Sequence, residues 1–357
     1  MSTNRVYNFN AGPACLPLEV VEQVRDGFMD FGGMSVLEIS HRSKAFEAVL
    51  DEARSLVAEL MGVPKGYHIL FLQGGASLQF AMVPMNLMGE TADYAVTGYW
   101  AKKAFAESKL VGSPRIAFSS EETGFDRTPA PSEIKVNDGA SYVHITTNNT
   151  ICGTQYRAFP DTGGVPLVAD MSSDIMSRDV DVSRFGLIYA GAQKNIGPAG
   201  VTMVIIRDDL AKAAARPLPA MLKYSTHADG GSLFNTPPVF AIYVTMLMLR
   251  WVKRQGGLTA MERANEEKAA LLYDAIDRSS FYKSRVEKNS RSRMNVVFTL
   301  PDEELTKRFL ALAGERGMVG LKGHRSVGGI RASIYNAFPR EGVEALVQLM
   351  KEFEANA

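Results

Sequence analysis

One lysine of the sequence, Lys194, has neighbours that favour chemical reactivity. It lies in segment 191–200, which reads Gly-Ala-Gln-Lys-Asn-Ile-Gly-Pro-Ala-Gly, between the apolar runs Leu187–Ala190 and Val201–Arg207. Most lysines are solvated surface charges. A lysine held between two buried strands, with room left around it by Gly and Ala, can lose its proton and attack a carbonyl group. We therefore expect Lys194 to act as a nucleophile.

A carboxylate, Asp170, closes another apolar run, Pro166–Ala169. Two interpretations of it are open. The side chain either caps the next turn through Ser172 or Ser173, or it faces a site at the end of the strand. A carboxylate of the second kind pairs with the protonated ring nitrogen of a cofactor and keeps that ring able to accept electrons.

Three further strand ends carry residues with binding chemistry. Gln73-Gly74-Gly75-Ala76-Ser77 precedes a helical pattern, and small residues on such a turn let backbone N–H groups approach a phosphate. Trp100, one of two tryptophans, offers a surface on which a flat ring can stack, and Thr150 offers a hydroxyl donor. The alternatives are, respectively, a simple tight turn, core packing of the indole, and a polar turn that caps its own backbone.

Two of the five histidines are followed directly by arginine, at His41-Arg42 and His324-Arg325. A further cation, Arg331, lies in a short apolar run. Each of these alone is typical of an ordinary surface charge. Together they suit a ligand with two anionic groups, because arginine binds a carboxylate through two parallel hydrogen bonds and a His-Arg cluster accepts a carboxylate or a phosphate.

Short apolar runs alternate with longer amphipathic ones, which predicts an α/β fold with a mostly parallel sheet covered by helices on both faces. Ligands of such sheets bind outside the carboxyl ends of the strands, so the residues above should converge there. The expected strands are His68–Leu72, Tyr94–Thr97, Arg115–Phe118, Tyr142–Thr146, Pro166–Ala169, Leu187–Ala190 and Val201–Arg207, and the expected helices are Ser77–Met88, Ala101–Lys109, Asp208–Ala215 and Val239–Arg254.

The pattern changes after Gly257, which indicates a smaller α/β domain. A chain of 357 residues exceeds what one core usually serves. We predict a large domain of residues 16–255 and a small domain of residues 1–15 and 256–357, to which the segment Tyr7–Pro13 returns. The elements expected in the small domain are a helix at Ala260–Asp277, a strand at Asn295–Leu300, a helix at Glu303–Arg316, a strand at Ile330–Ile334 and a helix at Glu341–Phe353.

The overall composition argues against several function classes. Lys+Arg and Asp+Glu both number 39, so we expect no nucleic-acid partner and no polybasic membrane contact. The longest apolar run, Val239–Leu249, is about half a membrane span, and residues 1–10 lack the pattern of a signal peptide. Two separated cysteines, Cys15 and Cys152, fit a reducing cytoplasm and leave a single disulfide open. No metal site is expected.

The order of these signals is more specific than any one of them: a phosphate turn, an aromatic residue, Thr, Asp and Lys, each at a strand end. In this order the sequence resembles the fold-type I enzymes that use pyridoxal 5′-phosphate (PLP), and most closely the phosphoserine aminotransferase family. The matching stretches, from near residue 8 to near residue 338, are Asn8-Phe9-Asn10-Ala11-Gly12-Pro13, Glu38-Ile39-Ser40-His41-Arg42-Ser43, Gln73-Gly74-Gly75-Ala76-Ser77, segment 190–200 around Gln193-Lys194-Asn195, Asn235-Thr236-Pro237-Pro238 and Gly323-His324-Arg325.

The resemblance implies a fold of the PLP-dependent transferase type and a role for each matching residue. Lys194 would hold PLP covalently and then move the proton between substrate and cofactor. Asp170 would pair with the ring nitrogen, Trp100 would stack on the ring, and Thr150 would bond the ring oxygen. The implied contacts to the cofactor phosphate are Gly75, Ala76 and Gln193, together with Asn235 and Thr236 of the neighbouring subunit.

The same resemblance implies a substrate site in a homodimer with shared active sites. Arg331 would hold the α-carboxylate of the substrate, and the two His-Arg pairs would hold its second anionic group, at the distal end of the side chain. His41 and Arg42 would reach into the partner's pocket. The implied reaction converts L-glutamate and 3-phosphohydroxypyruvate into 2-oxoglutarate and O-phospho-L-serine, a step of serine biosynthesis. The family also accepts a phosphorylated four-carbon oxo acid in pyridoxine biosynthesis, and the sequence leaves that activity open.

Three alternatives remain to be weighed. Another fold-type I aminotransferase acting on a small oxo acid, such as an alanine–glyoxylate aminotransferase, would have little use for two His-Arg pairs. A cysteine desulfurase needs a cysteine on a mobile loop, and Cys152 follows Thr150 too closely to move. A regulator that binds PLP without catalysis normally carries a DNA-binding module, for which the chain has neither spare length nor a basic patch.

Overall fold

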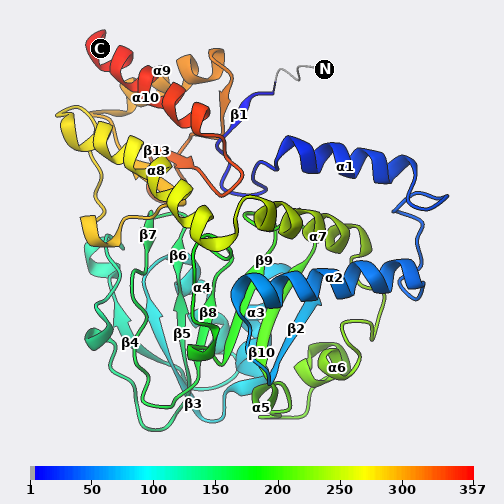
Figure 1. The fold of residues 1–357 in the computed structure, drawn as a ribbon. Coiled ribbons are helices and arrows are strands. Elements are labelled where there is room, and N and C mark those ends of the chain that lie inside the picture. The colour runs from blue at the N-terminus through cyan, green and yellow to red at the C-terminus, as the bar shows by residue number, and fades with distance from the viewer. Residues whose placement is uncertain (1–4) are drawn as a thin grey trace.

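The structure, a computed structural model, describes residues 5–357 of the chain. Its centre is a seven-stranded sheet in which β10 alone runs against its neighbours, so the predicted mostly parallel sheet is confirmed (Figure 1). All seven expected strands form, with ends shifted by at most a few residues. In spatial order they are β2 (Tyr67–Leu72), β10 (Thr202–Arg207), β9 (Leu187–Gly191), β8 (Leu167–Asp170), β5 (Ala140–Thr146), β3 (Thr91–Val96) and β4 (Arg115–Ser119).

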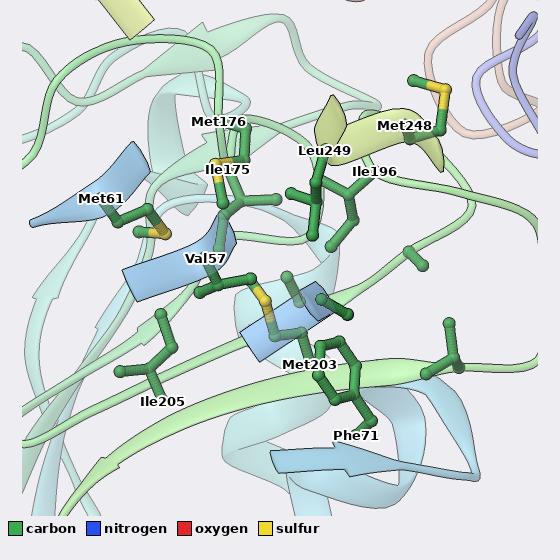
Figure 2. Close-up of a cluster of buried hydrophobic side chains, with 14 of the residues drawn as sticks. Val57, Met61, Phe71, Ile175, Met176, Ile196, Met203, Ile205, Met248 and Leu249 are labelled. Carbon is green, nitrogen blue, oxygen red and sulfur yellow. The ribbon is translucent and has the colours of Figure 1, made fainter. Parts of the chain in front are cut away.

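Helices cover both faces of this sheet because alternate side chains of each strand point to opposite sides. On one face, Phe71, Met203 and Ile205 pack against α2 (Lys44–Met61) and α7 (Val239–Arg254), as Figure 2 shows with Val57 and Leu249. The alternate residues of the same strands pack on the other face against α3 (Gly75–Leu87) and α4 (Tyr99–Ser108). The strands are therefore buried on both sides, which explains their near-continuous apolar runs.

Two helices near the N-terminus were not expected from the sequence. They are α1 (Leu18–Met29), which packs on α7, and α2. The ends of α2 do carry sequence signals. The Ser43 side chain accepts a hydrogen bond from the backbone N–H of Phe46, and Gly62 ends the helix in the left-handed conformation. These two residues are local signals for the start and the end of α2.

Two predicted helix boundaries were wrong. The helix expected at Asp208–Ala215 ends after one turn, as α5 (Asp208–Ala211), and the N–H of Ala215 bonds to the carbonyl of Asn86 instead of to a helix carbonyl. The helix after β3 begins at Tyr99 instead of Ala101, so Trp100 lies in the first turn of α4 and not in a loop. The remaining short elements outside the smaller part are α6 (Tyr224–Asp229), β6 (Asn148–Asn149) and β7 (Thr154–Gln155).

The last hundred residues form a part with its own apolar core, above the sheet in Figure 1. The N-terminal segment returns to it, since β1 (Tyr7–Asn8) pairs in parallel with β12 (Met318–Val319) and Phe9 is fully buried there. The division into residues 16–255 and residues 1–15 with 256–357 remains a prediction. The elements of this part are α8 (Gly257–Arg278), β11 (Asn295–Phe298), α9 (Glu303–Glu315), β12, β13 (Ile330–Ser333) and α10 (Arg340–Ala355).

No helix within residues 5–357 is long and apolar enough to cross a membrane. The same residues contain no group of three or more His, Cys, Asp or Glu side chains that is arranged to hold a metal ion.

A buried lysine ties this smaller part to the loop of Lys194. The Nζ atom of Lys268 on α8 is buried within hydrogen-bonding distance of four backbone carbonyls of the turn after β13, which fixes that turn. Within the turn, the N–H of Asn336 donates to Oδ1 of Asn195, the neighbour of Lys194, at 3.1 Å. The four carbonyls are those of Ile334 (3.1 Å), Tyr335 (2.6 Å), Asn336 (3.3 Å) and Phe338 (3.2 Å).

We predict that Lys268→Met lowers the free energy of unfolding by about 3 kcal/mol, because the apolar stem is kept while buried carbonyls lose a charged donor. The measurement is the midpoint of urea unfolding, compared with Lys351→Met on the exposed face of α10, which should change it little. Equal midpoints for the two variants would contradict the prediction.

Candidate active site

A cavity of about 580 Å³ lies at the edge of the sheet where the parallel strands end. The ends of β5, β8 and β9 contribute Thr146, Asp170 and Gly191 to its wall. Because β10 runs in the opposite direction, its beginning at Thr202 pairs with Gly191, and the preceding residue, Val201, also lines the cavity. The volume is typical of a site for a small molecule or cofactor.

The structure brings nine of the fourteen predicted site residues into the wall of this cavity and leaves five outside it. Those in the wall are Gly75, Ala76, Trp100, Thr150, Asp170, Gln193, Lys194, His324 and Arg331, and those outside are His41, Arg42, Asn235, Thr236 and Arg325.

One end of the cavity is formed by the N-terminus of α3, which follows β2. Gly74 and Gly75 both have positive φ angles (88° and 65°), a conformation that glycine adopts without strain. The turn directs the first residues of the helix, from Gly75 to Ser77, to the cavity. The first N–H groups of a helix lack partners within it, and the helix dipole favours negative charge at this end. This end of the cavity is therefore suited to a phosphate group.

The aromatic wall is held in place by hydrogen bonds. Nε1 of Trp100 donates to Oγ1 of Thr150 at 3.1 Å, and the carbonyl of Thr150 accepts from Nη1 of Arg331 at 3.3 Å. Gly98, just before α4, has no space for a side chain, since a Cβ atom would lie 2.2 Å from Oδ1 of Asn149. This close approach brings the start of α4, with its indole, against the loop that carries Thr150.

Asp170 fulfils both of the roles that the sequence left open. Its Oδ1 accepts the N–H of Ser172 at 2.9 Å, so the carboxylate does cap the following turn. The same side chain, which is only 5 % exposed, lines the cavity. Burial raises the pKa of this carboxyl group, while the charge of Lys194 and the hydrogen bonds from Ser172 act in the opposite direction. A cation placed beside Asp170 in the cavity is thus stabilised.

Lys194 lies opposite this carboxylate with its side chain in the cavity. Removal from water lowers the pKa of its amine, which the negative charge of Asp170 partly offsets, and the positive charge of Arg331 lowers it further. A lysine with a lowered pKa has a larger fraction of neutral, nucleophilic amine near neutral pH than a surface lysine. The expected reactivity of Lys194 therefore has a physical basis in its surroundings.

The guanidinium of Arg331 and the imidazole of His324, both from the smaller part, complete the cavity. Arg331 on β13 makes one hydrogen bond, to Thr150, and its buried Nε has no partner among residues 5–357. A buried guanidinium nitrogen without an acceptor is costly, so the site is built for an anion. His324 lies nearby, and burial together with the charges of Arg331 and Arg325 lowers its pKa. Arg325 itself is exposed.

Four of the residues outside the cavity lie on segments at the surface. His41 and Arg42 lie between α1 and α2, where Nε of Arg42 contacts the His41 ring at 3.3 Å, and Figure 1 shows this connection projecting at the right-hand edge. Nδ2 of Asn235 donates to Oε1 of Gln73 at 3.3 Å. Thr236 does not cap α7, because the N-cap of this helix is Pro238 and no side chain caps it.

Several residues that line the cavity were not predicted from the sequence. The N-terminal segment passes over Lys194, since the N–H of Ala14 donates to the carbonyl of Gln193 at 2.9 Å and Ala11 and Gly12 line the cavity. Ser172 was considered only as a partner of Asp170, although its Oγ also accepts from the N–H of Gly191 at 3.1 Å. No local pattern marks such residues, because the contacts join segments far apart in the sequence.

Comparisons with known proteins agree with this geometry. Residues 6–346 match the family model described as aminotransferase class-V. The chain is 58% identical to the phosphoserine aminotransferase of Geobacillus kaustophilus over 98% of each chain. It is 53% identical, with a TM-score of 0.97 and 99% of each chain covered, to the solved phosphoserine aminotransferase of Bacillus circulans subsp. alkalophilus. A PLP-bound phosphoserine aminotransferase from Trichomonas vaginalis is 39% identical, with 97% of this chain and 100% of that chain covered and a TM-score of 0.93.

The chain belongs to the phosphoserine aminotransferase family of class-V aminotransferases. It is a PLP-dependent transaminase, and the predicted family, fold and cofactor are confirmed. The cavity of this aminotransferase fits PLP in three respects. It has a helix N-terminus for the phosphate, a buried carboxylate for the ring nitrogen, and between them a lysine whose surroundings favour the neutral amine.

We predict that Lys194→Ala abolishes turnover and that soluble, folded protein is still obtained, because the side chain makes no structural hydrogen bond among the described residues. Borohydride reduction of the wild-type holoenzyme, followed by peptide mapping, should place the pyridoxyl label on Lys194 and not on an exposed lysine such as Lys212. A label on any other lysine would remove Lys194 from this role.

Proposed function

We propose that this aminotransferase converts L-glutamate and 3-phosphohydroxypyruvate into 2-oxoglutarate and O-phospho-L-serine. The observation that carries the proposal is the gathering of side chains that can bind anions at one side of the cavity. Arg331 and His324 line that side, and no carboxylate of residues 5–357 forms an ion pair with either. Both substrates have two anionic groups, and such a pair of groups needs cations at two places in the site.

Within this proposal, Asp170 and Lys194 have different roles in the reaction. PLP, when bound, supplies a protonated ring that accepts the electrons released at the α-carbon of the substrate. The negative charge of Asp170 would hold the proton on the ring nitrogen, and the hydrogen bond from the Ser172 N–H favours the ionised carboxylate against the effect of burial. Lys194, with its lowered pKa, would move the proton between the α-carbon of the substrate and the cofactor, in either direction of the reaction.

The remaining cofactor contacts follow from the positions in the wall. Trp100 stacks on the ring, and Thr150, held by the indole N–H, keeps its own hydroxyl hydrogen for the ring oxygen. The backbone of Gly75 and Ala76 binds the phosphate at the start of α3, with the Gln193 side chain beside it.

Arg331 and the pair His324-Arg325 would bind different groups of the substrate. Arg331, whose charge is felt at the Lys194 amine, holds the α-carboxylate that every amino-acid substrate carries. His324 and Arg325 hold the distal group, which is a carboxylate in glutamate and a phosphate in the other substrate. An aminotransferase for a small oxo acid such as glyoxylate has no distal anion, and the cations on this side of the cavity would then lack partners.

We expect the enzyme to use 3-phosphohydroxypyruvate far better than pyruvate or glyoxylate as amino acceptor, and Arg331→Leu to weaken all substrates alike. His324→Leu should raise KM more for the phosphorylated substrate than for 2-oxoglutarate, because a contact to a dianion is stronger than one to a monoanion. The difference in binding free energy should be about 1.5–3 kcal/mol at most. Steady-state kinetics of the two half-reactions measure these effects. A preference of the wild-type enzyme for glyoxylate would refute the proposed substrate.

The proposed working unit is a homodimer in which His41, Arg42, Asn235 and Thr236 serve the neighbouring cavity. Large apolar side chains on the segments that carry them are exposed, among them Met29 (82%) and Leu37 (62%). Phe28 of α1 stacks on Phe240 of α7 with 4.9 Å between ring centroids, so the two segments adjoin one apolar surface. Exposed apolar surface of this kind is typical of an interface between subunits.

The two cysteines, both free, suit a reducing cytoplasm.

The dimer can be tested by mixing two inactive variants, Lys194→Ala and Arg42→Ala, under conditions of subunit exchange. If Arg42 serves the partner's cavity, each heterodimer has one site with both defects and one intact site. Random mixing makes half of the dimers heterodimers, so about a quarter of wild-type activity should return. Verified exchange without recovery would show that Arg42 serves its own chain.

A further inference from the structure

Beside the distal end of the cavity, α4 carries two consecutive lysines with different surroundings. Lys102 forms an ion pair with Glu121. Lys103 is in none of the ion pairs of residues 5–357, and its Nζ lies over the ring of Trp100, 4.5 Å from the centroid. Lys103 does not line the cavity itself, and no sequence motif marked it. Its ammonium group is therefore an uncompensated positive charge at an aromatic wall of the active site.

The position of Lys103 connects it with the cations for the distal group. The Tyr99 ring, at the start of α4, lies 6.3 Å from the ring of His324, and the Tyr99 hydroxyl donates to the carbonyl of Ser326 at 3.4 Å. These contacts hold the first turn of α4 against the loop of His324 and Arg325. In agreement with this proximity, the positive charge of Lys103 is among the causes that lower the pKa of His324.

We propose that Lys103 is a specificity-determining residue, which draws the distal phosphate of the substrate to this side of the cavity more strongly than a distal carboxylate. The inference rests on the proposed function and extends it to a residue outside the His-Arg pairs. Lys103 is exposed, so it acts through water and by its charge, without a fixed hydrogen bond. Its Nζ atom lies over the indole ring of Trp100, which limits where the charge can move.

The size of the effect follows from the charge of the ligand. In water, two unit charges about 7 Å apart attract one another enough to change an affinity about threefold. When the lysine charge is removed, the affinity for a phosphate dianion should therefore fall about ninefold and the affinity for a carboxylate about threefold. Salt screens such an interaction, so the loss shrinks at an ionic strength of about 1 M, where the screening length is about 3 Å.

The experiment compares Lys103→Met with Lys103→Arg in the holoenzyme. Methionine keeps an apolar stem over the indole and removes the charge, whereas arginine keeps the charge. We expect Lys103→Met to lower kcat/KM about ninefold for 3-phosphohydroxypyruvate and about threefold for 2-oxoglutarate, chiefly through KM, and Lys103→Arg to restore both.

Two lysines of the same helix region serve as matched controls. Lys102→Met removes the neighbouring charge, which is already paired with Glu121. Lys109→Met removes a lysine whose Nζ also lies 4.5 Å from a ring centroid, that of Phe105, but away from the cavity. Neither variant should change the ratio of the two kcat/KM values.

A second measurement separates this inference from the proposed function. The dissociation constant of the holoenzyme for inorganic phosphate at pH 8, obtained by calorimetry, should rise about ninefold in Lys103→Met at low salt and much less in 1 M salt. Equal losses for both substrates, or an unchanged phosphate affinity, would overturn the role of Lys103. A wild-type enzyme inactive with 3-phosphohydroxypyruvate would refute the proposed function instead, and the phosphate measurement would still decide on Lys103.

Discussion

The active site depends on keeping two opposite charges, Asp170 and Lys194, at one buried edge of the sheet. Burial alone drives both groups toward their neutral forms, since it raises the pKa of the carboxyl group and lowers that of the amine. Their mutual attraction and the bond from the Ser172 N–H oppose this tendency for the carboxylate. These two contacts favour the ionised carboxylate, while burial favours the neutral amine of Lys194. Both states are needed for transamination, and neither would persist in a fully apolar or a fully solvated site.

The rest of the fold maintains this arrangement. The strands place Asp170 and Lys194 at adjacent carboxyl ends, and the reversed β10 closes the wall beside them. A buried polar network joins the sheet to the smaller part, with Asn148 bonded to Asn295 at 2.8 Å and Asn295 bonded to Ser333 on β13 at 2.9 Å. Through this network and through Lys268, the strand that carries Arg331 is fixed relative to the lysine. Substrate binding and proton transfer therefore depend on contacts between two separate cores.

Much of the fold could be predicted because its signals are local. Strands buried on both faces need long apolar runs, and all seven were recognised by them. Helices α1 and α2 were not predicted, although Ser43 and Gly62 mark the ends of α2, and α5 is shorter than predicted because the chain after it bonds to α3. The site was predicted from the same local order, since each strand end was followed by a residue with a chemical use. Nine of the predicted residues line the cavity.

The local pattern of the sequence is enough to show which residue types follow each strand, and hence the phosphate turn, Trp100, Asp170 and Lys194. The period of a strand and its direction fix where such residues lie, whatever the rest of the chain does. Only the tertiary structure decided that Arg331 and His324 line the cavity while Arg325 does not, and that Lys103 approaches it from α4. These residues come from segments whose relative position is set by packing of the smaller part on the sheet, and no local pattern encodes that packing. The roles of His41 and Asn235 depend on a second chain and stay predictions.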